Sequence, residues 1–419
     1  MSCMGAEKIE GLKSLFFERE DPKERLQFQQ LYEEICSMVK QELLPQLSSL
    51  SFIMFKPDTY LRGIISEVLA YLNLNGIYVS QFKVKKLSSE MIDRLYMFVK
   101  PKYISSWWIM EKAYDAAPCV PMILVGQQDT WGHLSSKVRE LLGPTTPLLG
   151  NEDQIRYRFR GTHRIFNILH GTDDPASAVR ESRVFFTWDE ISSALNHATQ
   201  LVQGFSPQLP DPKEIQDKVT PPKTDDINYP RARLRLKLGA LECVRKRLEI
   251  IQQETLSRGE SGSGISLKLT QLFQDFASLL TKEQRILEVE YPLRVERNTL
   301  GPILELERMT CVLGEQLVTE AITRVAQDVQ NYSKIQQKLA ILYDVIDALI
   351  IGKAMSSDIE FRELGFSKLS KSAVRLGIPF GHLDWLVLHA GLSVLDTEFF
   401  DYVGKYKSVY LGENATKEF

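Results

Sequence analysis

The sequence lacks any long uninterrupted run of apolar residues. No stretch reaches the roughly eighteen apolar residues that a membrane-spanning helix needs. The opening stretch MSCMGAEKIEGLKSLFFERE also has no long apolar core of the kind that secretory signals carry. The sequence therefore predicts a soluble, cytoplasmic protein that has no membrane partner.

Cysteine is scarce and dispersed. The cysteines show no CxxC spacing and stand at Cys3, Cys36, Cys119, Cys243 and Cys311. An odd, scattered set is typical of buried or free thiols in a reducing compartment. Neither a disulfide framework nor a zinc site is expected.

An excess of positive charge is also absent. The chain has 51 Lys and Arg against 54 Asp and Glu, a formal net charge of −3. No global positive field therefore favours nucleic acid or anionic membrane, and any anion site must be local. Residues 370–388 could be interpreted as a helix-turn-helix. The acidic flank Asp384, Asp396, Glu398 and Asp401 argues against DNA binding and favours a structural helix pair.

The composition is that of an ordinary globular protein of 419 residues, 44% hydrophobic and 25% charged. This length exceeds one usual domain, so several compact units are expected. No internal repeat period is evident. The predicted units are an N-terminal helical arm over 1–50, an α/β domain over 51–203, a proline-rich linker over 204–230 and a helical domain over 231–419.

Hydrophobic patterns predict the elements of the α/β domain. Short apolar runs predict strands at 52–55, 77–84, 120–125 and 165–169. Apolar residues spaced by three and four predict helices at 62–74, at 86–112 with a break at Pro101, and at 135–142. A further helix should start at Asp174-Pro175, capped by Asp173 or Asp174. The order β-α-β-α-β-α-β predicts an α/β sandwich with a ferredoxin-like core.

Helical periodicity also marks both ends of the chain. In the arm, Pro45 is expected to close the helix. Beyond the linker, apolar spacing predicts helices at 231–257, 266–288 and 300–353, and shorter ones over 358–410. The C-terminal part is therefore expected to form an all-α bundle.

One histidine stands within a polar cluster, in the stretch Asn167-Ile-Leu-His170-Gly-Thr-Asp-Asp174. A histidine that transfers a phosphoryl group needs an acceptor on its second ring nitrogen and donors for the transferring oxygens. Glu181, eleven residues after His170, is a candidate for the acceptor. The candidate donors, if the fold brings their loops together, are Lys56, Arg139, Thr145 and Arg156.

Two motifs frame this histidine. The first is Lys56-Pro-Asp-x-x-x-Arg62-Gly after an apolar strand, and the second is Asn-x-x-His170-Gly-Thr-Asp with Glu181. Between them stands Arg139-x-x-x-Gly-x-Thr145-x-Pro, and Arg156 follows Pro147 by nine residues. In these motifs and their separation, residues 52–188 resemble a nucleoside diphosphate kinase.

The resemblance implies a role for each matched residue. His170 would carry the phosphoryl group, Glu181 would bond its imidazole, and Thr172 would replace the usual serine of that network. Tyr96 would help to position the histidine, and Lys56 and Asn167 would contact the ribose and its hydroxyls. Nucleotide phosphates would bind Arg139, Thr145 and Arg156, and Lys102 stands where the family usually has a phosphate-binding arginine. Mg²⁺ would bridge the nucleotide's phosphates, with no protein metal cage.

The chain departs from the family pattern in places. The base-stacking phenylalanine falls near Tyr103-Ile104, where two extra residues precede Pro118. Arg156, Arg158 and Arg160 are three candidate phosphate ligands, of which loop spacing favours Arg156. Ordinary members assemble as hexamers or tetramers, so a homo-oligomer is one expectation. A protein partner for the helical domain is another.

Three functions are open at this point. The first is a ping-pong phosphotransferase that moves the γ-phosphoryl group of a nucleoside triphosphate to a diphosphate through His170. The second is a nucleotide-sensing or scaffold protein with a low-activity kinase-like domain. The third is a phosphohistidine transferase with a specialised acceptor. Turnover with ordinary diphosphates separates the first from the other two.

Overall fold

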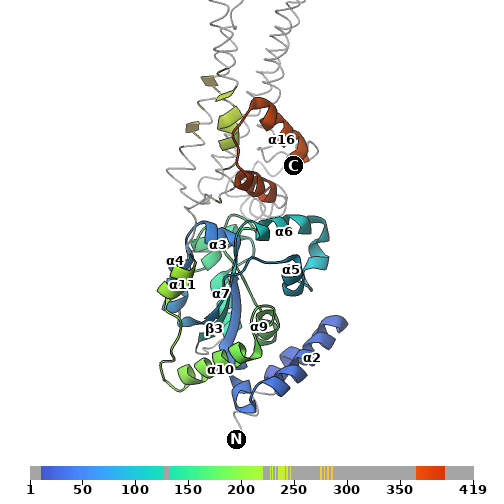
Figure 1. The fold of residues 1–419 in the computed structure, drawn as a ribbon, viewed down its shortest axis with the longest axis vertical. Helices are drawn as coiled ribbons and strands as arrows, with labels where there is room; N and C mark the ends of the chain where they lie inside the picture. Colours follow the sequence, from blue (N-terminus) through green and yellow to red (C-terminus); the bar gives the residue numbers. More distant parts are fainter. Residues whose placement is uncertain are drawn as a thin grey trace, which may run out of the picture. The chain divides into compact units, whose positions relative to one another are not determined.

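The computed structural model describes residues 11–126, 132–219 and 365–391, with scattered residues between 227 and 285 (Figure 1). The chain divides into two compact units, Met1–Ile227 with Ala390–Tyr402 and Asn228–His389 with Val403–Phe419. The first unit contains the sheet and all the candidate site residues. Within the described residues, no helix is both long and apolar enough to cross a bilayer.

The first unit is built on a four-stranded antiparallel sheet. Its strands are β1 (Leu50–Phe55), β2 (Ile77–Phe82), β3 (Val120–Gly126) and β4 (Leu169–Gly171), in the order β2-β3-β1-β4. Helical connections between strands in this order give the ferredoxin-like α/β sandwich, which confirms the predicted fold class. In the register of β1 and β4, His170 lies opposite Met54, so the histidine is on an edge strand.

The two faces of the sheet pack against different helices. Because successive strand side chains point to opposite faces, Phe52 and Met54 join one core while Ile53 and Phe55 join the other. The first core contains α9 (Pro175–Ser182), α10 (Trp188–Val202) and the N-terminal arm. The second contains α4 (Ile65–Leu74), α7 (Leu134–Leu142) and α11 (Pro212–Lys218) (Figure 1).

Short helices complete the connections between the strands. They are α3 (Pro57–Leu61), α5 (Ser89–Leu95), η2 (Lys100–Ser106), α6 (Trp107–Asp115), η3 (Pro147–Leu149) and α8 (Ile155–Arg158). The helix predicted over 86–112 is therefore three pieces, α5, η2 and α6, with Pro101 in the first turn of η2. Gly143 ends α7 at φ 76°, a backbone conformation that glycine adopts without steric penalty.

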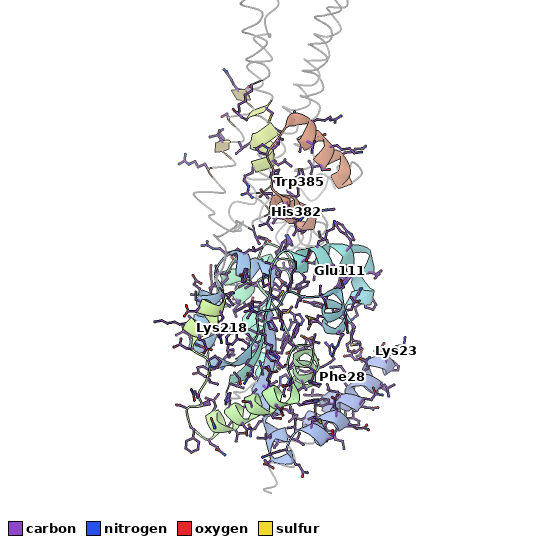
Figure 2. All side chains as sticks on the ribbon, in the orientation of Figure 1. Lys23, Phe28, Glu111, Lys218, His382 and Trp385 are labelled. Atoms are coloured by element: carbon purple, nitrogen blue, oxygen red, sulfur yellow. The ribbon has the colours of Figure 1, made fainter. Side chains whose placement is uncertain are left out.

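The N-terminal arm is helical, as expected, but its elements differ from the prediction. Residues 11–17 are helical, α2 spans Pro22–Met38, and η1 (Gln41–Ser49) is a 3₁₀ segment. Pro45 does not close the helix, because α2 has already ended at Met38 and Pro45 lies inside η1. Phe28 is 1% exposed and lies between α2 and the rest of the unit (Figure 2). The arm is thus packed into the core.

Two further segments differ from their predictions. The strand expected at 165–169 is confined to its last residue, because β4 begins at Leu169 and residues 165–168 form a loop. The segment predicted as a linker contains α11, whose residue Ile215 is buried together with Val219 in the second core. Its proline-rich composition hid these two apolar anchors.

The C-terminal part that the structure describes is helical. It includes α16 (Gly365–Leu376) and a second helix over 382–391, separated by a turn at Gly377. The helix predicted over 300–353 lies outside the described residues, as do most positions of 231–257 and 266–288. The domain bounds 1–50, 51–203, 204–230 and 231–419 therefore stay predictions.

Candidate active site

A cavity of about 410 Å³ opens beside β4 in the first unit. Its size is within the range of small-molecule pockets. The cavity brings together residues that are far apart in the sequence. They lie just after β1 and α5, on α7, α8 and β4, and in the loops after α7 and before β4. Those singled out from the sequence are Lys56, Tyr96, Arg139, Thr145, Arg156, Asn167 and His170.

A tight turn before β4 sets the position of the histidine. Ile168 has φ 78°, which is rare for a β-branched residue, and Leu169 N–H donates to the carbonyl of Asn167 at 2.9 Å. Ile168 N–H donates to the buried Asp58 carboxylate at 2.8 Å, and its carbonyl accepts from Lys56 N–H at 3.0 Å. The KPD segment thus holds this strained residue in place, two residues before His170.

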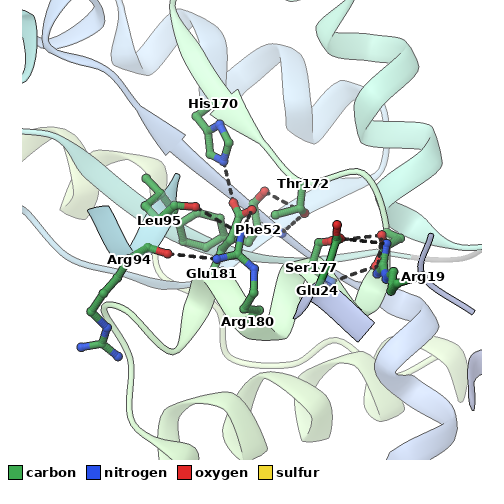
Figure 3. Close-up of polar contacts among 11 residues, drawn as sticks. Arg19, Glu24, Phe52, Arg94, Leu95, His170, Thr172, Ser177, Arg180 and Glu181 are labelled. Carbon is green, nitrogen blue, oxygen red and sulfur yellow. Dashed lines mark hydrogen bonds and ion pairs between the residues drawn. The ribbon is translucent and has the colours of Figure 1, made fainter. Parts of the chain in front are cut away.

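His170 is bonded to Glu181 of α9. His170 Nε2 donates to Glu181 Oε2 at 2.5 Å, since a carboxylate oxygen accepts (Figure 3). Both side chains are largely buried, 18% and 8% exposed. This bond assigns the proton to Nε2 and leaves Nδ1 as the ring nitrogen with a lone pair.

Aromatic rings pack around the imidazole. Tyr96 contacts it edge-on with ring centroids 5.0 Å apart, and Phe52 does so at 6.5 Å. The Tyr96 hydroxyl bonds the buried Tyr114 hydroxyl. Burial raises the pKa of Tyr96, so its hydroxyl stays protonated at neutral pH. These rings restrict the imidazole to one orientation.

Arginines supply positive charge at the cavity. Arg156 is 3% exposed and donates to the carbonyls of Gly143 at 2.9 Å and Leu169 at 3.1 Å. Burial, with repulsion from Arg139 as a second cause, lowers the pKa of Arg156 to about 10. Arg139 is more exposed, and its Nε donates to Asp173 at 2.8 Å. Because this pKa is still well above 7, the buried Arg156 guanidinium is charged at neutral pH.

Lys56 holds the loop that leads into β4. Its ammonium donates to Asn167 Oδ1 at 2.7 Å, to Ile165 O at 2.9 Å and to Arg164 O at 3.3 Å. Asn167 Nδ2 donates in turn to Thr145 O at 2.9 Å. The amide therefore links the loop before β4 to the loop after α7.

Some predicted residues lie elsewhere. Lys102 is exposed and is absent from the cavity lining, and the same holds for Arg158, so of the arginine run Arg156 is the one that enters. Thr172 is buried, and its hydroxyl bonds the Phe52 backbone at 3.3–3.4 Å instead of Glu181 (Figure 3). Tyr103 lines the cavity.

Other lining residues were not singled out for this role. They include Val99, Trp107, Met110, Thr146 and Arg164. The Trp107-Trp108 pair was a signal, because only one of two adjacent helical residues can face a given surface. Trp107 is the buried one, at 4% exposed, against 39% for Trp108. The sequence could not show that it faces this cavity.

The donors of the cavity do not form a metal cage. Among the residues that the structure describes, no group of three or more His, Cys, Asp or Glu side chains could hold a metal ion. Asp173 is the carboxylate among the lining residues, and it is paired with Arg139.

Comparison with known proteins finds one family over this part of the chain. The nucleoside diphosphate kinase family model matches residues 50–191, which include every lining residue of the cavity. A nucleoside diphosphate kinase of Kosmotoga olearia is 33% identical over 141 residues, covering 34% of this chain and 90% of the relative. One from Pelotomaculum thermopropionicum is 30% identical over 152 residues, covering 34% and 89%. A solved family structure from Babesia bovis is 26% identical, covers 34% of this chain and 90% of that one, and has a TM-score of 0.30.

Proposed function

Because the chain belongs to the nucleoside diphosphate kinase family, and the matched residues contain the whole cavity, we propose that it moves the γ-phosphoryl group of a nucleoside triphosphate to a nucleoside diphosphate. The group travels through a phosphohistidine at His170, in a ping-pong sequence. Family membership establishes a kinase-like phosphotransferase domain. The phosphohistidine and the residue roles below are the proposal.

The bond between His170 and Glu181 selects the reacting atom. With Nε2 engaged, the Nδ1 lone pair attacks the γ-phosphorus, the bond from phosphorus to the bridging oxygen breaks, and the diphosphate leaves with the electron pair. In the second half, a terminal oxygen of an incoming diphosphate attacks the same phosphorus and the N–P bond breaks. Glu181 keeps the Nε2 proton in place throughout.

The observation that carries the proposal is the buried charge of Arg156 beside His170. Among the described residues, its guanidinium donates to backbone carbonyls and to no carboxylate, and its buried Nε makes no hydrogen bond. Taking a cation out of water is costly unless an anion accompanies it. Arg139 adds a second cation at the same cavity. A multiply charged phosphate chain is the ligand that offsets both charges.

The neighbouring polar residues fit the rest of a nucleotide. Lys56 and Asn167 form one hydrogen-bonded pair at the cavity, and we assign them to the ribose and its hydroxyls. Thr145, whose carbonyl accepts from Asn167, is assigned to the phosphates with Arg139 and Arg156. Lys102 has no place in this set, because it does not line the cavity.

Magnesium fits the cavity only as an ion that arrives with the nucleotide. Mg²⁺ prefers oxygen ligands and keeps several waters, and the single lining carboxylate, Asp173, suits contact through water. When bound, the ion supplies neutralisation of phosphate charge. The protein's own part is to align the phosphates on its arginines and to hold Nδ1 of His170 toward them.

Labelling tests the proposal directly. The full-length protein is incubated with [γ-³²P]ATP and Mg²⁺ and then split between acid and alkali. The label is expected to be lost in acid and kept in alkali, and to be absent from His170→Ala. His382→Ala, a histidine exposed in the second unit, is the matched control and should label like the wild type. Undiminished label on His170→Ala would overturn the assignment.

Transfer out of the labelled protein separates the remaining alternatives. Rapid loss of label to ADP or GDP supports the proposed reaction. Label that leaves only to another acceptor supports a specialised phosphohistidine transferase, and saturable nucleotide binding without any label supports a sensor or scaffold. Homo-oligomer formation, a protein partner for the helical domain and cytoplasmic location stay predictions.

A further inference from the structure

Glu181, the partner of His170, is itself held by an arginine that does not line the cavity. Arg180 Nη2 donates to Glu181 Oε1 at 2.6 Å, while the other carboxylate oxygen accepts from His170 (Figure 3). Arg180 also donates to the carbonyls of Arg94 at 3.0 Å and Leu95 at 3.2 Å. The side chain is 15% exposed. Each oxygen of Glu181 therefore has its own fixed partner, so the carboxylate cannot rotate freely about its last bond.

Aromatic rings connect Arg180 to the N-terminal arm. The Arg180 guanidinium lies over the Phe98 ring, 5.2 Å from its centroid. Phe98 is stacked on Phe28 of α2, with ring centroids 6.0 Å apart and an interplanar angle of 25°. Arg19 lies over the same Phe28 ring at 4.1 Å. A continuous line of contacts thus runs from Arg19 in the arm to His170.

The arm also holds the opposite end of the helix that carries Glu181. Arg19 Nη2 donates to both oxygens of Asp174, each at 2.9 Å. Asp174 is the N-cap of α9 and accepts from Ser177 N–H at 2.8 Å. Glu181 is in the last turn of this helix. The arm therefore contacts α9 at its start directly and near its end through Phe98 and Arg180.

We propose that Arg180 is a positioning residue for the His170–Glu181 pair and that the N-terminal arm sets its position. The arm is then part of the phosphotransfer machinery, although it lies outside the matched family residues 50–191. This inference rests on the proposed function of His170. The physical reason is that an imidazole attacks phosphorus only when its ring is correctly oriented. Each fixed partner behind the ring reduces the range of orientations that it can adopt.

The chain offers a matched control for Arg180 in Arg183. Arg183 stands three residues further on, lies over the Trp188 ring at 4.5 Å and donates to the carbonyl of Phe186 at 2.8 Å. It also approaches Glu34 of α2 at 3.8 Å. It resembles Arg180 in charge, ring contact and link to the arm. Its backbone N–H donates to the Glu181 carbonyl, but its guanidinium bonds Phe186 and Glu34 and not the Glu181 carboxylate. A general effect of removing an arginine here would appear in both variants.

The first experiment measures phosphoryl transfer in Arg180→Met and Arg183→Met of the full-length protein. In Arg180→Met the rate of phosphohistidine formation is expected to fall roughly 10- to 100-fold, by analogy with the loss seen when a hydrogen-bond partner behind a metal-bound histidine is removed. The KM for ATP should change less than about twofold, since no nucleotide-binding residue is altered. Arg180→Lys should recover part of the rate. Equal rates in Arg180→Met and Arg183→Met would overturn the positioning role.

The second experiment tests whether the arm acts through Arg180. Phe28→Leu is expected to slow phosphohistidine formation by about 2- to 10-fold in the wild-type background. In Arg180→Met it should have almost no further effect, because the contact that transmits it is gone. Phe17→Leu is the control, as Phe17 also belongs to the arm but contacts Tyr32 instead of Phe98. Additive effects of Phe28→Leu and Arg180→Met would exclude the proposed path.

Arg19→Gln provides an independent variant if Phe28→Leu fails to fold. It removes the charged contact to Asp174 and should lower the rate in the same direction, and an unchanged rate would contradict the role of the arm. Failure of the proposed function has a different signature, namely wild-type protein that acquires no label. Labelled wild type with unaffected arm and Arg180 variants would overturn this inference alone.

Discussion

The cavity has two walls whose side chains differ in burial and in hydrogen bonding. The polar wall consists of Lys56, Arg139, Arg156, Asn167 and His170. The wall that we call aromatic consists of Tyr103 and Trp107 together with the apolar residues Val99 and Met110. On the polar wall, Arg156 is 3% exposed and bonded to two carbonyls. On the aromatic wall, Trp107 is 4% exposed, but Tyr103 is 47% exposed.

We relate this difference to two tasks of the site, phosphoryl transfer and nucleobase selection. Phosphoryl transfer needs fixed donors and a fixed nucleophile. On the polar wall, backbone carbonyls hold Lys56 and Arg156, and the Glu181 carboxylate holds His170. Holding a nucleobase needs only a flat apolar surface, which an exposed aromatic residue on a short 3₁₀ segment can provide. We therefore expect variants of the polar wall to affect every nucleotide and variants of the aromatic wall to affect some more than others.

The largest effect is expected from Arg156→Met. This change removes a buried cation that would contact the phosphates, so kcat/KM should fall by about 100-fold or more for all nucleoside triphosphates. Arg158→Met is the matched control, because Arg158 is on the same short helix but exposed and outside the cavity lining. Steady-state kinetics with ATP and GTP measure both. A loss confined to one base would break the comparison between the walls.

The next effect is on stability and concerns the loop before β4, to which the Lys56 ammonium donates. His163 in this loop is buried, its Nδ1 accepts from Ile165 N–H at 3.3 Å, and burial lowers its pKa to about 3. Between pH 6.5 and 3 the unfolded chain binds a proton that the folded chain does not, so the free energy of unfolding falls on acidification. The expected slope from this residue is on the order of 1 kcal/mol per pH unit.

Urea unfolding of His163→Gln at pH 7 and pH 5 measures this effect. The variant should lose less stability on acidification than the wild type, whereas the exposed His382→Gln should behave like the wild type. An equal loss in all three proteins would show that His163 is not responsible for the pH dependence.

A smaller effect is expected from Arg139→Gln. Arg139 is 37% exposed and already paired with Asp173, so its contact with phosphate is screened by solvent and shared. The KM for nucleotides should rise by about 3- to 10-fold, by the same factor for each base. Lys137→Gln, on the same helix but outside the cavity lining, is the control. A larger loss than in Arg156→Met would reverse the order of importance within the polar wall.

The smallest effect is expected from Tyr103→Ala on the aromatic wall. Stacking on a half-exposed ring should contribute modestly, so the KM for ATP is expected to rise by about fivefold while kcat stays unchanged. Ile104→Ala is the control, since Ile104 is 66% exposed and does not line the cavity. KM values measured with four nucleoside triphosphates show whether the effect depends on the base. No change with any of them would remove Tyr103 from base binding.

Much of the polar wall was predictable because its residues lie in motifs of fixed spacing. Lys56 and Asn167 are each one position in such a motif, and the structure brings them within 2.7 Å of one another. Arg164 and Met110 were not predicted as cavity residues. Arg164 reaches the cavity from a loop and Met110 from α6, and no local sequence pattern marks either position. Lys102 is the opposite case. It stands at the position of a phosphate-binding arginine in the resembled family, but it does not line the cavity.

The N-terminal arm was also predictable in part. Its helical periodicity was evident, but Pro45 was misjudged because 3₁₀ segments tolerate a proline that an α-helix interior does not. The sequence could not show that Phe28 stacks on Phe98, since the two rings are seventy residues apart and meet only when α2 packs on the sheet's first core. The helix α11 within the predicted linker was not predicted either, because Ile215 and Val219 are its few buried apolar side chains.

The sequence by itself determined the fold class, the family and the pairing of His170 with Glu181. These depend on the local spacing of residues and on the alternation of apolar and polar positions. Only the tertiary structure decided which arginine is buried at the cavity, which aromatic residues form its second wall and what lies behind Glu181. The physical reason is that burial and charge environment depend on contacts between distant segments. A guanidinium such as that of Arg156 acquires its lowered pKa from the cavity around it, and not from its neighbours along the chain.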